Sequence, residues 1–129
     1  MVWNELAQEK YLLLTTFKKD GVAVATPVWV VPDGERILVW TDAKSWKVKR
    51  LRRNPTVTLR ACDRRGHPTG EQVCDGTGRV LDAAGTERVR DLITGKYGVI
   101  GTLVVRGHKL FLGAEKSIGL AITPGHEPA

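Results

Sequence analysis

The stretch VWTDAKSWKVKRLRRNPTVTLR, residues 39–60, predicts a strand, a turn, a short basic helix and a second strand. We expect the helix over residues 45–53, because Val48 and Leu51 can then face inward while the cations face outward. The Asn-Pro pair at residues 54–55 ends the helix, since a residue before proline avoids the helical region of backbone space.

The same stretch gathers positive charge and hydroxyl groups at the start of this helix. Six cations lie within ten residues: Lys44, Lys47, Lys49, Arg50, Arg52 and Arg53. Thr41 and Ser45 stand just before the helix, where hydroxyls and free backbone N–H groups can face an anion. Residues three or four apart share a helix face, so Lys47 and Arg50 can act together while Lys49 points elsewhere. The pattern predicts a phosphate-binding site, and the alternative is an ordinary solvated helix face.

Apolar runs separated by turn residues predict further strands on both sides of this stretch. The predicted strands cover residues 11–17, 22–31, 36–41, 56–62, 71–81 and 115–123, and the predicted helices cover residues 3–10, 45–53 and 86–97. Pro27 predicts an edge or a bulge, and Gly76 and Gly78 predict a bulge or a close backbone approach. Residues 99–105 fit either a helix or a strand. Six short antiparallel strands with a helix after the third predict a mainly β (α+β) fold, built as a small barrel.

Length, charge and hydropathy limit the class of protein. The chain has 129 residues and a formal net charge of +6, from which we expect one domain over residues 1–129 with a loose tail from about residue 124. No apolar run reaches the roughly 20 residues of a membrane helix, and no export signal is evident at the N-terminus. We therefore expect a cytoplasmic location and no membrane partner. The positive charge favours anionic partners in general.

The segment KVKRLRRNP, residues 47–55, resembles the pyridoxamine 5′-phosphate oxidase-like superfamily. The opening YLLLTTFKKDGVAVATPVWVV, residues 11–31, carries the same resemblance, which covers about residues 5–124. The short length and the CDRRG segment, residues 62–66, resemble the branch that uses the deazaflavin coenzyme F420. The resemblance implies a six-stranded antiparallel split β-barrel and a homodimer that holds its cofactor at the subunit interface.

The resemblance, together with the helix spacing, assigns cofactor contacts to nine residues: Thr26, Pro27, Val28, Trp40, Thr41, Ser45, Trp46, Lys47 and Arg50. It implies that residues 26–28 lie beside the flavin-like ring and that residues 45–47 grip the phosphate. Flavin-oxidase members usually carry an arginine where this chain has Trp46, which weakens the case for FMN. Trp46 could stack on a ring or form a pocket wall.

The function implied is a reductase that transfers a hydride from reduced coenzyme F420 to an activated double bond of a small organic substrate. No catalytic side chain is identified, because the cofactor carries the chemistry in hydride transfer. The alternatives are an FMN-dependent oxidase or reductase of the same fold, a carrier that binds coenzyme F420 without turnover, and a basic nucleic-acid module. We expect no nucleic-acid partner, because aromatic residues that could stack on bases are not interleaved with the cations.

The remaining reactive or aromatic residues are expected to be structural. Cys62 and Cys74 are predicted to be small core residues, since no Cys–His pair is evident. The three histidines lack metal-ligand spacing, so no metal site is expected. Trp29 is expected in the core or at an interface, and Trp40 either in the core or at a cofactor wall. The outward cations Lys49, Arg52 and Arg53 serve solubility or attract the polyanionic oligoglutamate tail of coenzyme F420.

Overall fold

The structure is a computed structural model that describes residues 2–112 and 117–125, with side chains described for residues 3–98 and 117–125. The strands are β1 (Tyr11–Phe17), β2 (Ala23–Asp33), β3 (Arg36–Asp42), β4 (Thr56–Cys62), β5 (Pro68–Val80) and β6 (Ser117–Pro124). The helices are α1 (Val2–Ala7), α2 (Trp46–Arg53) and α3 (Ala83–Leu112).

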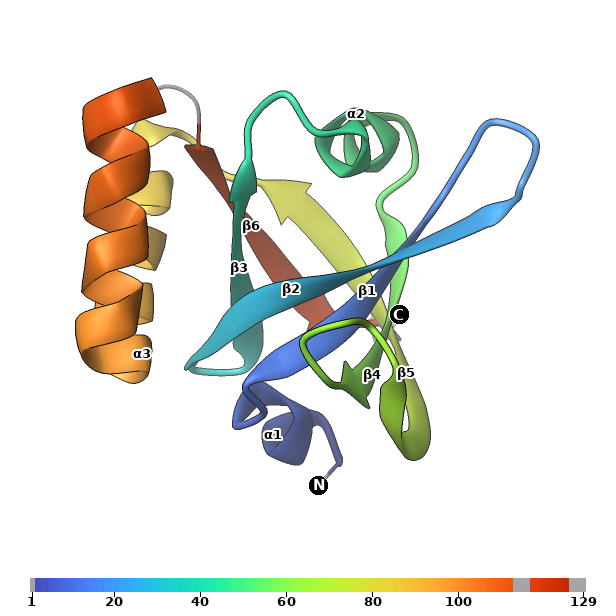
Figure 1. Cartoon of the computed structure of the whole chain (residues 1–129). Helices are drawn as coiled ribbons and strands as arrows, with labels where there is room; N and C mark the ends of the chain where they lie inside the picture. Colours follow the sequence, from blue (N-terminus) through green and yellow to red (C-terminus); the bar gives the residue numbers. More distant parts are fainter. Residues whose placement is uncertain (1, 113–116, 126–129) are drawn as a thin grey trace.

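The strands close into an antiparallel barrel in the order β1-β2-β3-β6-β5-β4, which Figure 1 shows. β1, β2 and β3 form the predicted meander, β4 returns to pair with β1, and β6 pairs with both β3 and β5 to close the barrel. The expected six-stranded antiparallel barrel is therefore confirmed.

Alternation along the strands divides the buried side chains into two clusters. In β3, Ile37 and Val39 face the barrel interior, whereas Leu38 between them packs in a second cluster with Val89 and Ile93 of α3. Successive strand residues point to opposite faces of a sheet. The continuous apolar run of β3 thus reflects a strand that is covered on both of its faces.

The short helices α1 and α2 lie at opposite ends of the barrel (Figure 1). Trp3 and Leu6 of α1 join the interior cluster, as do Val48 and Leu51 of α2. The inward face predicted for α2 is confirmed, because both of its predicted apolar residues are buried. Packing of this face sets the orientation of α2 and therefore the direction in which its other side chains project.

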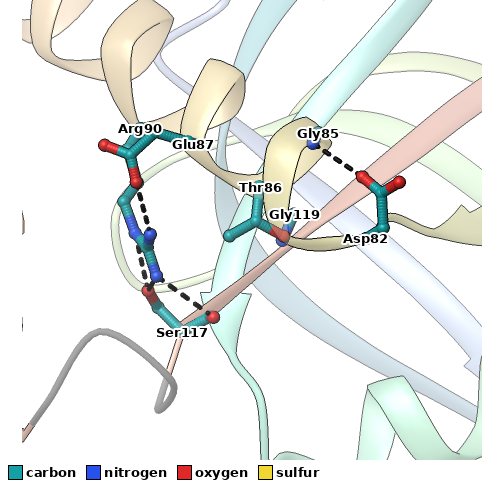
Figure 2. Close-up of polar contacts among 7 residues, drawn as sticks. All are labelled: Asp82, Gly85, Thr86, Glu87, Arg90, Ser117 and Gly119. Carbon is teal, nitrogen blue, oxygen red and sulfur yellow. Dashed lines mark hydrogen bonds and ion pairs between the residues drawn. The ribbon is translucent and has the colours of Figure 1, made fainter.

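Helix α3 stands beside the barrel and is tied to β6 by the polar contacts that Figure 2 shows. The Asp82 carboxylate accepts a hydrogen bond from the Gly85 N–H at 2.8 Å, so Asp82 caps the helix. The Thr86 hydroxyl accepts one from the Gly119 N–H at 3.0 Å. A Cβ added at Gly119 would lie 2.7 Å from Val89, so this glycine permits the close approach of α3 to β6.

Several element boundaries differ from the prediction. β5 begins at Pro68 rather than at residue 71, and α3 continues to Leu112, so residues 99–105 are helical, beyond a break at Gly98 where φ is 62°. Gly76 and Gly78 mark close approaches: an added Cβ would lie 2.8 Å from Ile122 and 2.9 Å from Leu51, respectively. The β4–β5 pairing shifts register between Arg60 and Cys62 instead, so a bulge at the glycines is not found.

The remaining predictions about segments concern Pro27, the last strand and the tail, and membrane-spanning helices. β2 pairs with β1 through Pro27, while its pairing with β3 starts at Trp29, so the predicted edge at Pro27 is confirmed. Residues 115–116 of the last predicted strand and residues 126–129 of the predicted tail lie outside the described residues. Within the described part, we find no helix with the length and apolar character needed to cross a membrane.

Candidate functional site

The N-terminus of α2 carries polar groups that the protein itself does not use. Ser45 occupies the N-cap position with φ −66° and ψ 153°, and its side chain makes no capping hydrogen bond. The Ser45 Oγ is buried and has no hydrogen-bond partner among the described residues. The first turn of α2 contains no acidic residue. Because a buried polar group without a partner is costly, the helix N-terminus is ready to accept an anion.

Lys47 brings a positive charge to the same place. Its ammonium forms no hydrogen bond or ion pair within the described part of the chain. Burial lowers the pKa of Lys47, the nearby Arg50 charge lowers it further, and Asp42 opposes the shift. A cation that is partly desolvated and repelled by a neighbour is stabilised when an anion binds beside it.

Arg50 is held inside the molecule, away from any ligand. Its side chain is buried, and its Nε donates a hydrogen bond to the Thr16 Oγ1 at 2.7 Å. The predicted cooperation between Lys47 and Arg50 is electrostatic, since the charge of Arg50 acts on the Lys47 ammonium. Arg50 therefore adds positive potential to the site without lining it.

A cavity of about 240 Å³ opens next to Lys47 on the outer surface of the barrel. It is lined by Tyr11, Pro27, Val28, Trp29, Trp40, Thr41, Lys47 and Arg64. Trp29 and Trp40 face each other across the β2–β3 pair, with ring centroids 6.5 Å apart and an angle of 31° between the rings. The other neighbour of Trp29 is Tyr97 of α3, stacked with a centroid distance of 4.3 Å. The cavity thus has aromatic walls and a cation at the α2 end.

The structure brings together five of the nine residues predicted for the site: Pro27, Val28, Trp40, Thr41 and Lys47. Thr26 pairs with Leu14 one step further along β2 and does not line the cavity. Ser45 lies at the α2 N-terminus beside the cavity, and Arg50 is turned inward.

Trp46 lies outside the cavity. Its side chain is 69% exposed, and the Lys49 Nζ lies 4.4 Å from the centroid of its ring. Residues two apart on a helix point in different directions, so the inward packing of Val48 leaves Trp46 facing outward. Trp46 therefore does not line this cavity.

Three lining residues were not predicted: Tyr11, Trp29 and Arg64. Trp29 was expected in the core or at an interface, because an apolar strand neighbourhood does not separate a core position from a pocket wall. Arg64 belongs to the CDRRG segment, and its position depends on how the turn after β4 folds. Gly66 has a φ of +86°. A Cβ added to Gly66 would lie 3.5 Å from the Pro27 side chain, so this turn lies against β2.

Other reactive residues do not form a second centre. Cys62 is buried, and Cys74 is partly buried against the barrel-interior cluster, as predicted. Burial raises the pKa of both thiols, which disfavours the nucleophilic thiolate. Among the described residues, no group of three or more His, Cys, Asp or Glu side chains could hold a metal ion.

A larger cavity of about 920 Å³ lies elsewhere, along β5 and β6, and includes Arg52, Gly78 and Thr123. None of the nine predicted residues lines it. We assign the site to the smaller cavity because it is lined by Thr41 and by Lys47, whose ammonium has no partner among the described residues. Size alone does not identify a binding site when the convergent polar groups lie elsewhere.

Comparison with known families shows to which family this chain belongs. Residues 3–108 match the family model described as pyridoxamine 5′-phosphate oxidase. The chain belongs to the pyridoxamine 5′-phosphate oxidase family. The closed six-stranded barrel is the split barrel of that family, and the family binds flavin or deazaflavin cofactors. No curated protein matches the chain.

Solved structures share this split barrel at low sequence identity. A conserved hypothetical protein from Mycobacterium tuberculosis has a TM-score of 0.72 and 20% identity, over 97% of this chain and 79% of that one. A protein described as an F420 reductase has a TM-score of 0.62 and 17% identity, over 98% and 95%. HutZ, described as a heme storage protein from Vibrio cholerae, has a TM-score of 0.62 and 17% identity, over 96% and 88%. Pyridoxamine 5′-phosphate oxidase relatives thus include both oxidoreductases and storage proteins.

Proposed function

We propose that this protein is a reductase that uses coenzyme F420 and transfers a hydride from the reduced deazaflavin to an activated double bond of a small organic substrate. The observation that carries the proposal is the polar N-terminus of α2. There the Ser45 hydroxyl is buried without a partner, and Lys47, two residues further on, lines a cavity with aromatic walls. A ligand with a planar ring and a phosphate matches this combination.

The residues present fit such a cofactor. Ser45 can donate its hydroxyl hydrogen to a phosphate oxygen, and Lys47 can add a charge-assisted hydrogen bond. Residues 27–28 and Trp40 line the cavity and offer a strand edge and an aromatic face along which a ring can lie. When bound, the deazaflavin would supply the hydride, and the side chains would supply orientation and electrostatics. The described residues that line the cavity include no carboxylate and no histidine, which suits chemistry that needs no protein nucleophile.

The size of the cavity supports a site completed by a second copy of the chain. Its volume of about 240 Å³ is below the roughly 300–1,000 Å³ of a complete small-molecule pocket. Members of the family typically act as dimers with flavin-type cofactors. A homodimer that closes the cavity at the subunit interface follows from the proposal, and sedimentation of the purified protein would measure it.

Two features favour coenzyme F420 over FMN. The position of the arginine that flavin-oxidase members carry is occupied by Trp46, which is 69% exposed, so no second cation reaches the phosphate from there. A structure with the same fold is described as an F420 reductase. Both observations support the deazaflavin cofactor, and FMN is the alternative that the experiment must separate from it.

The experiment is a fluorescence titration of the purified protein with coenzyme F420 and, separately, with FMN at moderate salt. Binding of coenzyme F420 at micromolar or lower concentration, without FMN binding, is the expected result. The reverse preference would assign the protein to the flavin-dependent members. Binding of neither cofactor would overturn the proposal and leave the α2 N-terminus to another anion.

A carrier that binds coenzyme F420 without turnover is the second candidate. It is favoured by the fold shared with a heme storage protein and by a described cavity lining that holds no carboxylate and no histidine. Turnover separates the two functions. Oxidation of the reduced cofactor by a panel of enones would support the reductase, whereas tight binding with no oxidation by any of them would support the carrier.

A further inference from the structure

The turn between β4 and β5 is a rigid platform for Arg64. The Asp63 N–H donates to the His67 carbonyl oxygen at 2.9 Å, and the Gly66 N–H donates to the Asp63 carbonyl oxygen at 3.0 Å. The Asp63 Oδ1 also accepts hydrogen bonds from the N–H groups of Arg65 and His67, both at 2.9 Å. The neighbouring carboxylate is thus engaged by the turn itself.

Close packing at Gly66 places this turn against the site. A Cβ added at Gly66 would lie 3.5 Å from the Pro27 Cδ and 3.6 Å from the Leu13 Cδ1. The turn therefore lies directly on β1 and β2, at the edge of the cavity. Arg64 lines that cavity, whereas Arg65 does not.

The Arg64 guanidinium has no anion to neutralise it. It makes no hydrogen bond or ion pair within the described residues, and no carboxylate lines the cavity. Lys47 lines the same small space and is likewise without a partner. Two cations facing one low-dielectric cavity repel each other unless negative charge lies between them.

The two cations approach from opposite edges of the site. Lys47 follows β3, whereas Arg64 follows β4, and β1 and β2 lie between these strands in the barrel. Three strand spacings of about 4.8 Å therefore separate the elements that carry them. This separation suits a ligand with two electronegative centres better than a single anion shared by both cations.

We infer that Arg64 is the second anion-binding residue of the cavity and takes a negative or carbonyl centre of the ligand distinct from the phosphate. The inference rests on the proposed function for the identity of the phosphate-bearing ligand. The second centre is either the carbonyl edge of the flavin-like ring or the carbonyl of the bound acceptor. Both offer the oxygen acceptors that a planar guanidinium recognises.

The test compares Arg64→Gln with Arg65→Gln, a matched change of a neighbouring exposed arginine outside the cavity. Each variant and the wild type are titrated with riboflavin and with the ribityl deazaflavin that lacks phosphate. If Arg64 contacts the ring, its replacement weakens binding of the phosphate-free chromophore roughly tenfold, while Arg65→Gln stays within about twofold of the wild type.

A second arm tests whether Arg64 contacts the carbonyl group of the bound acceptor. If the chromophore binds unchanged to Arg64→Gln, a rise of roughly tenfold in the KM for an enone, absent in Arg65→Gln, assigns the contact to the substrate. Chromophore affinity and enone KM that are both the same in the two variants would overturn the inference.

A third arm separates this inference from the proposed function. A wild-type protein that binds neither coenzyme F420 nor FMN would remove the proposed function, and the fluorescent aromatic sulfonate ANS then tests Arg64 alone. In a Lys47→Gln background, Arg64 is the remaining cation of the cavity lining. Addition of Arg64→Gln should weaken ANS binding about tenfold relative to addition of Arg65→Gln. Equal ANS affinities in the two double variants would overturn the inference.

Discussion

A lysine of α3 and a lysine at the cavity are both partly buried but have different partners. Lys96 of α3 donates hydrogen bonds to the carbonyl oxygens of Ala7, Glu9 and Val30 at 2.6–3.1 Å. Burial lowers the pKa of Lys96 to about 8, and it also lowers the pKa of Lys47. Desolvation therefore does not distinguish these two lysines. The partners do, because Lys47 has none among the described residues.

Arginines show the same difference. Arg90 is buried in α3, where its guanidinium donates to the Glu87 carboxylate at 2.7 Å and to the Ser117 hydroxyl at 2.6 Å (Figure 2). Arg64 at the cavity donates to no described residue. A buried charge that is fully hydrogen-bonded stabilises the fold, whereas a charge left open at a concave site is available to a ligand. The contrast teaches that cation function in this protein depends on partners more than on burial.

The largest effect is expected where a partnered cation is removed. Arg90→Met should lower the free energy of unfolding by about 2–3 kcal/mol, because Glu87 and Ser117 lose their charged donor. Arg52→Met, at an exposed position of α2, should change it by less than about 0.5 kcal/mol. Urea unfolding followed by circular dichroism measures both variants. Equal losses would break the contrast between the two regions.

Removal of an unpartnered cation should affect binding instead of folding. Lys47→Ala is expected to weaken cofactor binding by roughly 1–3 kcal/mol, the range for a hydrogen bond to a charged group. The free energy of unfolding should change little, since no described residue loses a partner. Lys49→Ala serves as the control because Lys49 lies over the exposed Trp46 ring. An unchanged dissociation constant in Lys47→Ala would remove Lys47 from the site.

The pH dependence of binding sharpens the role of Lys47 further. Its pKa is lowered from the ordinary value of 10.5, so the ammonium is lost at a lower pH than in a free lysine. Cofactor affinity should therefore begin to fall at a pH below 10.5 as the pH rises, in a range where the phosphate charge is constant. Lys47→Arg should flatten this dependence, because a guanidinium stays charged. The same decline in both proteins would mean that another group titrates.

The smallest effect concerns a carboxylate that bridges two arginines near α3. The Asp33 oxygens lie 2.8 Å from the Arg88 Nη2 and 2.9 Å from the Arg36 Nη2, and hydrogen bonding to Arg88 and then to Arg36 lowers the pKa of Asp33. The stabilisation is present above the ordinary value of 3.8 and is lost as the pH falls through the lowered value. Asp33→Asn should cost about 0.5 kcal/mol at neutral pH and less at pH 3. Thermal unfolding at both pH values measures it, and a cost that grows with acid would contradict the assignment.

Local sequence signals predicted some site residues and missed others for physical reasons. The hydroxyl before α2 and the lysine inside it were found because helix N-termini follow short-range rules. Trp29 was expected in the core or at an interface; it packs against the second buried cluster and also lines the cavity, because alternation cannot tell a core position from a pocket wall. Arg64 was missed because its position depends on the Gly66 turn lying on Pro27, a contact between segments far apart in the chain.

By itself, the amino-acid sequence determined the barrel and the position of the basic helix α2 after β3. Strand alternation, proline and glycine positions and the inward face of α2 are local properties, and the expected strands and helices follow from them. The tertiary structure alone decided which cations have partners. Arg50 meets Thr16, 34 residues away, and Arg90 meets Ser117, 27 residues away. Such hydrogen bonds depend on how distant strands pack, so periodicity cannot predict which positive charges stay open for a ligand.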